Sequence, residues 1–194
     1  PEVCIFFESQ LLRGNRTTKI NAEGFNAFRS FNFPPLAHAG IHIKYDQHLI
    51  RRPDPAQPFK PHFLVENSVM ILTIFPGIRK EVVDTCLNVA GIRAVILKTF
   101  GAGNAPQRPW FMERIRQLVN RGVIVVNITQ CSQGTVEMHR YGTGLHLLQA
   151  GVINGYDSTM EAVITKLMYL LAHHDKNEDV IRLMNEDIAG EITL

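Results

Sequence analysis

The chain has 194 residues and a formal net charge of +2, a length that suits one full domain, or one small domain with part of another. Its 45% hydrophobic and 20% charged residues are typical of an ordinary globular protein. The low charge, without a basic stripe interleaved with aromatics, argues against a nucleic-acid surface. No apolar run reaches the roughly 18 residues of a membrane span, and no signal peptide is visible.

Cysteine and histidine usage argues against disulfide and metal sites. The three cysteines, Cys4, Cys86 and Cys131, lie far apart, each in or beside an apolar segment. We therefore expect reduced, mostly buried thiols and a cytoplasmic compartment. The eight histidines show neither HxH nor HExxH spacing, so no metal site is predicted.

The first 45 residues read as short, mostly extended segments. A strand is expected over Val3–Phe7, and extended structure over Gln10–Ile20, with a turn at Gly14–Asn15. Ala22–Phe28 could form a short helix that ends before Pro34 and Pro35. Ile41–Tyr45 alternates apolar and polar residues, which predicts a half-exposed strand.

Residues 46–67 change character, because Pro53, Pro55, Pro58 and Pro61 fall among charged residues. Such a composition is typical of a semi-rigid linker, and it gives the best domain boundary. We therefore divide the chain into residues 1–45, a proline-rich linker over 46–67, and a second domain over 68–194.

The second domain shows regular alternation of strands and helices. Three runs, Val69–Phe75, Ala94–Phe100 and Val123–Thr129, are apolar at successive positions, as in parallel strands covered on both faces. Helical periodicity between them predicts βαβαβ, a small doubly wound parallel sheet of the α/β class. Further helices are expected over three stretches: Leu145–Gly151, Ser158 to about His173 (opened by a Ser158–Glu161 capping box), and about Asn177 to Ala189.

Polar residues close two neighbouring strands of this sheet. Lys98 and Thr99 lie at the end of the second run, with Asn104 in the turn after it, and residues 127 and 129–132 (Asn, then Thr-Gln-Cys-Ser) close the third. Carboxyl ends of parallel strands bind ligands in open sheets, so this edge is a candidate small-molecule site. Two interpretations of Lys98 stay open: a carboxylate-binding cation, or a strand end already at the surface.

Other chemistry at this edge is less well supported. Gly101-Ala-Gly103 before a helix could cradle a phosphate, but Pro106 replaces the third glycine of a dinucleotide fingerprint. Cys131 lacks an evident histidine and acid for nucleophilic catalysis. On its pattern alone, Lys19 is a solvated residue of an edge strand.

Several motifs together resemble one family, the bacterial type I (cytoplasmic) L-asparaginases. The resemblance runs from about Val3 to Thr193, but covers only the second half of the usual chain. The motifs occur in the family's order: Arg13-Gly-Asn-Arg-Thr-Thr-Lys19, Pro34-Pro-Leu36, Gly101-Ala-Gly-Asn-Ala-Pro106, Asn127-Ile-Thr-Gln-Cys131, Ala150-Gly-Val-Ile153 and the helix Glu161–Leu171.

The resemblance implies hydrolysis of L-asparagine to L-aspartate and ammonia without a cofactor. It implies a fold in which residues 1–45 are the tail of a larger α/β domain and a small flavodoxin-like domain follows. Family enzymes use a threonine nucleophile and a second threonine activated by an aspartate and a lysine. Lys19 matches that lysine by the Thr-Thr-Lys motif. The Thr-Gly-Gly-Thr-Ile and Gly-Thr-Asp-Thr motifs are absent, so we expect the chain alone to be inactive.

The resemblance also implies oligomers and regulation. The family forms dimers, usually paired into tetramers, and Asn104 resembles the residue that reaches a neighbour's active site. Some members bind asparagine at an allosteric site. Lys98 occupies a position where the family usually has arginine. A lysine ammonium offers a single point charge, whereas an arginine guanidinium can donate two parallel hydrogen bonds. The positions matching the allosteric site are Thr18, Lys98, Asn104, Thr129 and Cys131.

Two other functions stay open. The chain could be a non-catalytic amino-acid sensor that uses the strand ends alone. It could also belong to the related amidase domains of lysophospholipase-like proteins, or to those of tRNA-linked amidotransferases. The preference between asparagine and glutamine is not fixed by these residues.

Overall fold

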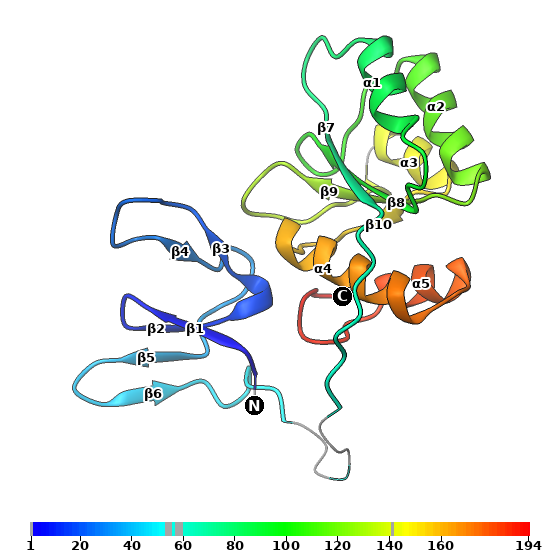
Figure 1. Cartoon of the computed structure of the whole chain (residues 1–194). Helices are drawn as coiled ribbons and strands as arrows, with labels where there is room; N and C mark the ends of the chain where they lie inside the picture. The colour runs from blue at the N-terminus through cyan, green and yellow to red at the C-terminus, as the bar shows by residue number, and fades with distance from the viewer. Residues whose placement is uncertain (1, 53–55, 57–59, 141) are drawn as a thin grey trace.

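The computed structural model describes residues 2–52, 56, 60–140 and 142–194, and it consists of two parts joined by an extended segment (Figure 1). Pro53, Pro55 and Pro58 of the predicted linker lie outside the described residues. Where it is described, the segment after residue 60 is extended and leads into the second part. None of the helices in the described ranges has the length and apolarity needed to cross a membrane.

The first part consists of short strands. Four of them form an antiparallel sheet in the order β1-β2-β5-β6, and β3 pairs with β4 as a separate hairpin. A single 3₁₀ turn at Gly14–Arg16 leads into β3. The strands are β1 (Cys4–Phe7), β2 (Gln10–Arg13), β3 (Thr18–Lys19), β4 (Phe28–Arg29), β5 (Ala37–Ala39) and β6 (Ile43–Tyr45).

The helix considered for Ala22–Phe28 is wrong, because residues 22–27 lie in the loop of the β3–β4 hairpin and Phe28 begins β4. The Asn21 side-chain oxygen accepts hydrogen bonds from the backbone N–H groups of Glu23 and Gly24, each at 3.0 Å. An asparagine that captures these donors favours a turn over a helix.

The first part leaves much of its apolar surface uncovered. Phe6 is 62% exposed, Ile43 59% and Tyr45 52%, all on the four-stranded sheet. All three residues of β6 are therefore exposed, whereas the alternating pattern predicted that one face would be buried. Within the described ranges, no element covers the side of the sheet that carries these residues.

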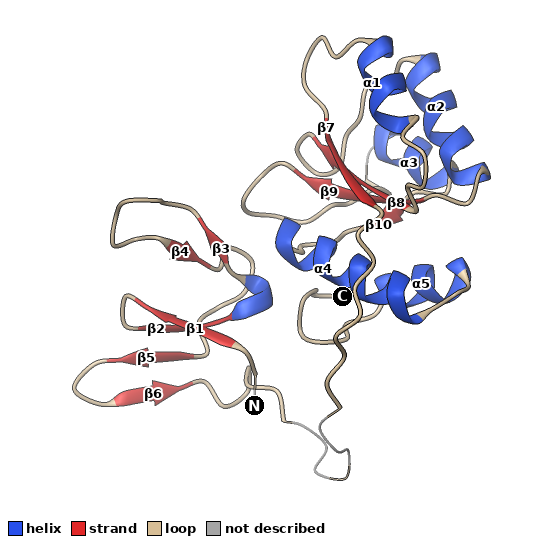
Figure 2. Ribbon diagram, in the orientation of Figure 1, coloured by secondary structure: helices blue, strands red, loops and turns tan. Residues whose placement is uncertain are grey.

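The second part is a parallel sheet between two helical layers, which confirms the predicted α/β class. The strands follow in the order β10-β9-β8-β7, and each neighbouring pair is parallel. Helices α1 to α3 cover one face, and α4 and α5 cover the other (Figure 2). The elements are β7 (Val69–Thr73), α1 (Lys80–Leu87), β8 (Ala94–Thr99), α2 (Pro109–Asn120), β9 (Ile124–Thr129), α3 (Gly142–Gln149), β10 (Ile153–Asn154), α4 (Met160–His173) and α5 (Asn177–Met184).

Successive side chains of each strand point to opposite faces of the sheet, so the core of the second part consists of two clusters, one on each face. In β8, Val95 and Leu97 pack against α1, α2 and α3, whereas Ala94 and Ile96 pack against α4 and α5. All four side chains are fully buried. β8 and β9 are therefore strands covered on both faces, as predicted. The prediction does not hold for β7, which lies at the edge of the sheet and leaves Ile71 38% exposed.

The predicted bounds of three helices need correction. α4 starts one residue later than the capping box implies, since the Thr159 hydroxyl, not that of Ser158, accepts from the N–H of Ala162. α3 starts earlier than predicted, at Gly142. α5 ends at Met184, because carboxylates downstream capture the backbone: Asp187 accepts from the N–H of Gly190, and Glu191 from that of Ala189.

The carboxyl-terminal tail joins the two parts of the structure. Arg16, 2% exposed, donates to the Glu191 carbonyl at 2.8 Å. The Glu191 carboxylate lies 2.5 Å from the ammonium of Lys166 in α4, and both side chains are buried. Arg13 reaches the carbonyl of Gly190. Buried charges need partners, so these contacts hold the first part against α4.

Candidate functional site

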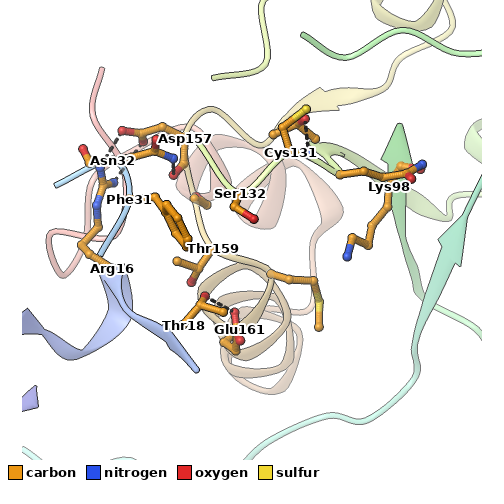
Figure 3. A pocket seen from close by; sticks show the side chains of 14 residues that line it. Arg16, Thr18, Phe31, Asn32, Lys98, Cys131, Ser132, Asp157, Thr159 and Glu161 are labelled. Atoms are coloured by element: carbon orange, nitrogen blue, oxygen red, sulfur yellow. Dashed lines mark hydrogen bonds and ion pairs between the residues drawn. The ribbon is translucent and has the colours of Figure 1, made fainter. Parts of the chain in front are cut away.

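A pocket of about 250 Å³ opens where the two parts meet at the carboxyl ends of β8 and β9 (Figure 3). This volume lies just under the range of about 300–1,000 Å³ that is typical for drug-sized ligands, so the pocket suits a smaller molecule. Its lining comes from the first part, from both strand ends and from the start of α4: Arg16, Thr18, Phe31, Asn32, Lys98, Thr129, Gln130, Cys131, Ser132, Asp157, Ser158, Thr159, Met160 and Glu161.

Four of the five residues expected in the effector site line this pocket: Thr18, Lys98, Thr129 and Cys131. They come together because β8 and β9 are adjacent and parallel, with Thr99 opposite Thr129. Thr18 arrives from the β3–β4 hairpin of the first part. A 3.1 Å hydrogen bond from its hydroxyl to the Glu161 carboxylate joins β3 to α4.

Lys98 supplies a cation to the pocket. Its side chain runs into the cavity from the end of β8 (Figure 3). Over residues 2–52, 56, 60–140 and 142–194, its ammonium makes no hydrogen bond or ion pair. An ammonium group that is half withdrawn from water and has no protein partner favours an anionic ligand.

Arg16 and Asp157 form a rigid wall of the pocket. Arg16 Nη1 and Nη2 donate to the two Asp157 carboxylate oxygens at 3.0 and 2.5 Å. Burial by itself would raise the pKa of Asp157, but hydrogen bonds from Arg16 and Thr193 outweigh it and lower that pKa below its usual value. Asn32 closes this side by donating to the Asp157 carbonyl. Asp157 is therefore already neutralised by the protein.

The remaining charge in the pocket comes from Glu161, in the first turn of α4. Its carboxylate accepts from Thr18 and stays exposed to the cavity. Beside it, the first N–H groups of α4 lack intrahelical partners, as in any helix. The pocket thus combines one cation, one anion and several hydroxyls, a set that can hold a small zwitterion.

Asn104 lies outside the lining of the pocket. It closes the turn after β8, where its backbone pairs with that of Phe100. Its side-chain oxygen accepts from the hydroxyl of Thr143 in α3. The structure therefore does not bring Asn104 together with the other four expected effector residues.

Lys19 also lies outside the pocket, although Thr18 beside it is in the lining. The two form β3, where Thr18 is half-buried and Lys19 exposed. Successive residues of a strand point to opposite faces, which accounts for the difference. The Lys19 ammonium lies 6.0 Å from the centre of the Phe28 ring.

The structure adds residues that the sequence did not single out for the site. Arg16, Asn32, Asp157 and Glu161 all line the pocket. The sequence offered one signal, the polar run Asp157-Ser-Thr, of which we interpreted only Ser158, together with Glu161, as a capping box. Arg16 and Asn32 come from distant turns, and no local pattern marks them.

The cysteines are free, but Cys131 is exposed at the pocket rather than buried as predicted; Cys4 and Cys86 are half-buried. Burial raises the pKa of Cys4, and the nearby carboxylate of Glu2 adds to the effect. Within the part of the chain that the structure describes, no three His, Cys, Asp or Glu side chains gather to form a metal site.

Comparisons with known families agree along the chain. The family model described as Asparaginase, N-terminal matches residues 1–51. The one described as Glutaminase/Asparaginase C-terminal domain matches residues 68–184. Together they cover both parts of the structure.

Individual relatives are longer than this chain. L-asparaginase 1 of Escherichia coli is 43% identical over 99% of this chain, which spans 56% of that protein. The crystal structure of L-asparaginase I from Vibrio cholerae matches with a TM-score of 0.92 and 44% identity, covering 100% of this chain and 58% of that one. The human 60 kDa lysophospholipase is 40% identical over all of this chain, which spans 34% of its length.

Proposed function

Because the chain belongs to the asparaginase family, we propose that it forms part of an L-asparaginase that hydrolyses L-asparagine to L-aspartate and ammonia. The observation that carries this proposal is the match of both family models in order, with 43% identity to L-asparaginase 1 of E. coli. The chain spans about half the length of the curated asparaginases it matches.

In this proposal the chain supplies Lys19, and the nucleophilic threonine comes from the other half of the enzyme. Lys19 is exposed on β3, in the part of the chain that matches the N-terminal family model, so its ammonium is accessible to another part of the enzyme. A lysine near a hydroxyl and a second charge can share a proton with that hydroxyl and activate it. The chain alone then has no complete active site.

Asn104 contributes to the active site of a neighbouring subunit. Two features support this role: the turn that carries it is braced by backbone and side-chain hydrogen bonds, and Asn104 lies outside the lining of the pocket. A group that acts across an interface needs such a fixed position. The enzyme is accordingly a homo-oligomer, a dimer or a pair of dimers, and we place it in the cytoplasm.

The pocket binds a free amino acid as a regulator. Lys98 attracts the ligand carboxylate and Glu161 its ammonium, while Thr18 and Cys131 complete the walls. With Asp157 already paired to Arg16, these are the two opposite charges left for a zwitterion. L-asparagine, the substrate, is the proposed effector.

A second candidate is an asparaginase-like domain within a larger protein of the lysophospholipase kind, favoured by the 40% identity to the human 60 kDa lysophospholipase. The same pocket could also serve an amino-acid sensor without catalysis. Both candidates predict binding at the pocket, but the sensor predicts no hydrolysis.

The test is ammonia release from L-asparagine by the chain alone and by the chain joined to the amino-terminal half of a type I asparaginase, hereafter the completed enzyme. We expect turnover only from the completed enzyme. Robust turnover by the 194 residues alone would contradict the proposed division of the active site. Binding of L-asparagine without turnover in either form would favour the sensor.

A further inference from the structure

Four consecutive backbone carbonyls of the carboxyl-terminal tail accept hydrogen bonds from four side chains of the first part, which we call the tail site. The donors come from the end of β2, the 3₁₀ turn after it and residue 51. Protein surfaces that hold a peptide by its main chain use such a row of hydrogen bonds to successive backbone groups. Ile188 accepts from Arg51 at 2.9 Å, Ala189 from Asn15 at 2.8 Å, Gly190 from Arg13 at 3.4 Å and Glu191 from Arg16 at 2.8 Å.

The tail forms a turn that satisfies its own backbone donors. The Glu191 carboxylate accepts from the N–H groups of Ile188 and Ala189 at 3.2 and 2.6 Å, and Asp187 accepts from that of Gly190 at 2.6 Å. The N–H groups are thus bound within the tail, while the carbonyls are bound by the first part. A segment that holds its bound shape by itself loses less conformational entropy on binding.

The arginines of the tail site need the acceptors that the tail offers. Arg13 and Arg16 are buried, and a guanidinium has five donors and stays charged in proteins. A buried donor without an acceptor is costly, so the tail carbonyls stabilise two buried cations. Each arginine is also held by a carboxylate, which orients it toward the tail. The pairs are Arg13–Glu2, Arg16–Asp157 and Arg51–Asp187.

We propose that the tail site is a peptide-binding site whose ligand is residues 187–193 of this chain, and that it binds the same segment as a separate peptide. Backbone carbonyls supply the affinity, so the site requires few particular side chains, chiefly glycine at 190 and a carboxylate at 191. The bound tail fastens the second part to the first, because it continues from α5 and Lys166 of α4 holds the Glu191 carboxylate.

The ligand fits the site most closely at Gly190. Its φ is +80°, and a Cβ added there would lie 2.7 Å from Arg13 Nη1. Arg13 has little freedom to move away, since it also donates to Glu2 and to the Leu49 carbonyl. Gly91 has a φ of +79°, with no atom of the described chain within 4 Å of an added Cβ. Gly91→Ala therefore carries the same backbone strain without the contact and is a matched control for Gly190→Ala.

The first experiment detaches the tail from the folded chain. A recognition sequence for a site-specific protease is inserted between Asn185 and Glu186, in the turn after α5, and the purified chain is cut and dialysed. A fluorescent peptide of residues 186–194 is then added and its anisotropy is followed. We expect the tail to remain bound or the labelled peptide to bind saturably. A Gly190→Ala peptide should bind about tenfold more weakly or worse, and a peptide with Ala for the exposed Leu194 should bind normally.

The second experiment uses the uncut chain, so it does not depend on the insertion. Carboxypeptidase digestion past Glu191 measures how often the tail leaves its site, because a protease cuts released segments. We expect digestion about tenfold faster in Gly190→Ala than in Gly91→Ala, which should match the wild type. Asn15→Ala, which removes the donor to Ala189, should also speed digestion, with Asn120→Ala at the exposed end of α2 as its control.

Two results would overturn the proposal. One is a cut chain that keeps its circular dichroism, loses its tail and shows no saturable binding of the peptide. The other is digestion of Gly190→Ala and Asn15→Ala at the rates of their controls. Neither measurement involves L-asparagine, so both are independent of the tests of the proposed function.

Discussion

The Thr18 hydroxyl donates a 3.1 Å hydrogen bond to Glu161 Oε2 across 143 positions of sequence. This contact joins β3, which carries Lys19, to the first turn of α4, which faces the pocket. The proposed catalytic lysine is therefore the direct neighbour of a pocket residue. In the proposed function, a ligand that draws Glu161 toward itself would act on the strand that carries Lys19.

The first prediction concerns the ammonium end of that ligand. Glu161→Gln keeps the shape and the hydrogen bond from Thr18 but removes the charge. Loss of one charge-assisted contact of about 1.5–3 kcal/mol weakens L-asparagine binding about tenfold to about a hundredfold. Calorimetry on the chain measures it, with Glu178→Gln in α5, away from the pocket, as the control. Equal affinity of Glu161→Gln and wild type would remove Glu161 from the site.

The second prediction concerns the carboxylate end. Lys98→Met should abolish measurable binding of L-asparagine, because no other unpaired cation lines the described pocket. Lys98→Arg should bind at least as tightly as the wild type, since a guanidinium can grip a carboxylate with two parallel hydrogen bonds. If Lys98→Met binds normally, the lysine is only a strand end at the surface.

The third prediction concerns acid stability. The Arg16 hydrogen bonds lower the pKa of Asp157 from its ordinary value of 3.8, and those of Lys166 lower the pKa of Glu191 from 4.5, in both cases against the opposing effect of burial. A lowered folded-state pKa adds stability at pH values above the unfolded pKa, and this stability is lost as the pH falls through the folded pKa. The free energy of unfolding should therefore be flat near neutral pH and decline below about pH 4.5.

Asp157→Asn tests the source of that decline. Asp157→Asn should lower the free energy of unfolding at neutral pH, because Arg16 keeps a buried charge without its counter-ion. It should also reduce the decline of the free energy of unfolding at acid pH. Asp187→Asn, in the exposed pair with Arg51, serves as the control and should change neither. Urea unfolding at a series of pH values measures both effects. If the free energy of unfolding of Asp157→Asn declines at acid pH as much as that of the wild type, the ion pair does not govern acid stability.

The fourth prediction tests whether Asn104 acts across a subunit interface. In the completed enzyme, Lys19→Met and Asn104→Ala each lower activity on their own. When the two variants are mixed and reassembled, one site of each mixed pair regains both residues. The activity of the mixture should exceed the sum of the separate variants. No gain on mixing would place Asn104 in the active site of its own subunit.

The parallel sheet could be predicted from sequence because its signal is local. Runs such as Ala94–Leu97 are apolar at successive positions, and a strand buried on both faces needs this pattern. Helix bounds were less accurate because single hydrogen bonds decide them. Ser158 and Thr159 are both good N-caps, and only the contact with the Ala162 N–H selects Thr159.

The part of the candidate site at the strand ends could be predicted because its signal is also local. Lys98 and Thr129 end adjacent strands, so their meeting follows from the sheet. Arg16 and Asp157 meet only because the tail and the 3₁₀ turn fold against α4, which depends on long-range contacts. The stretch Ala22–Phe28 was wrongly predicted as a helix because the Asn21 side-chain oxygen, in place of a helical backbone carbonyl, accepts from the Gly24 N–H.

The catalytic role of Lys19 is tested most directly by the steady-state rate of ammonia release from L-asparagine by the completed enzyme carrying Lys19→Met. Lys44→Met, an exposed lysine on β6, is the matched control. We predict that Lys19→Met lowers kcat by orders of magnitude with unchanged circular dichroism, whereas Lys44→Met leaves it intact. A kcat for Lys19→Met equal to that of the control would contradict the account.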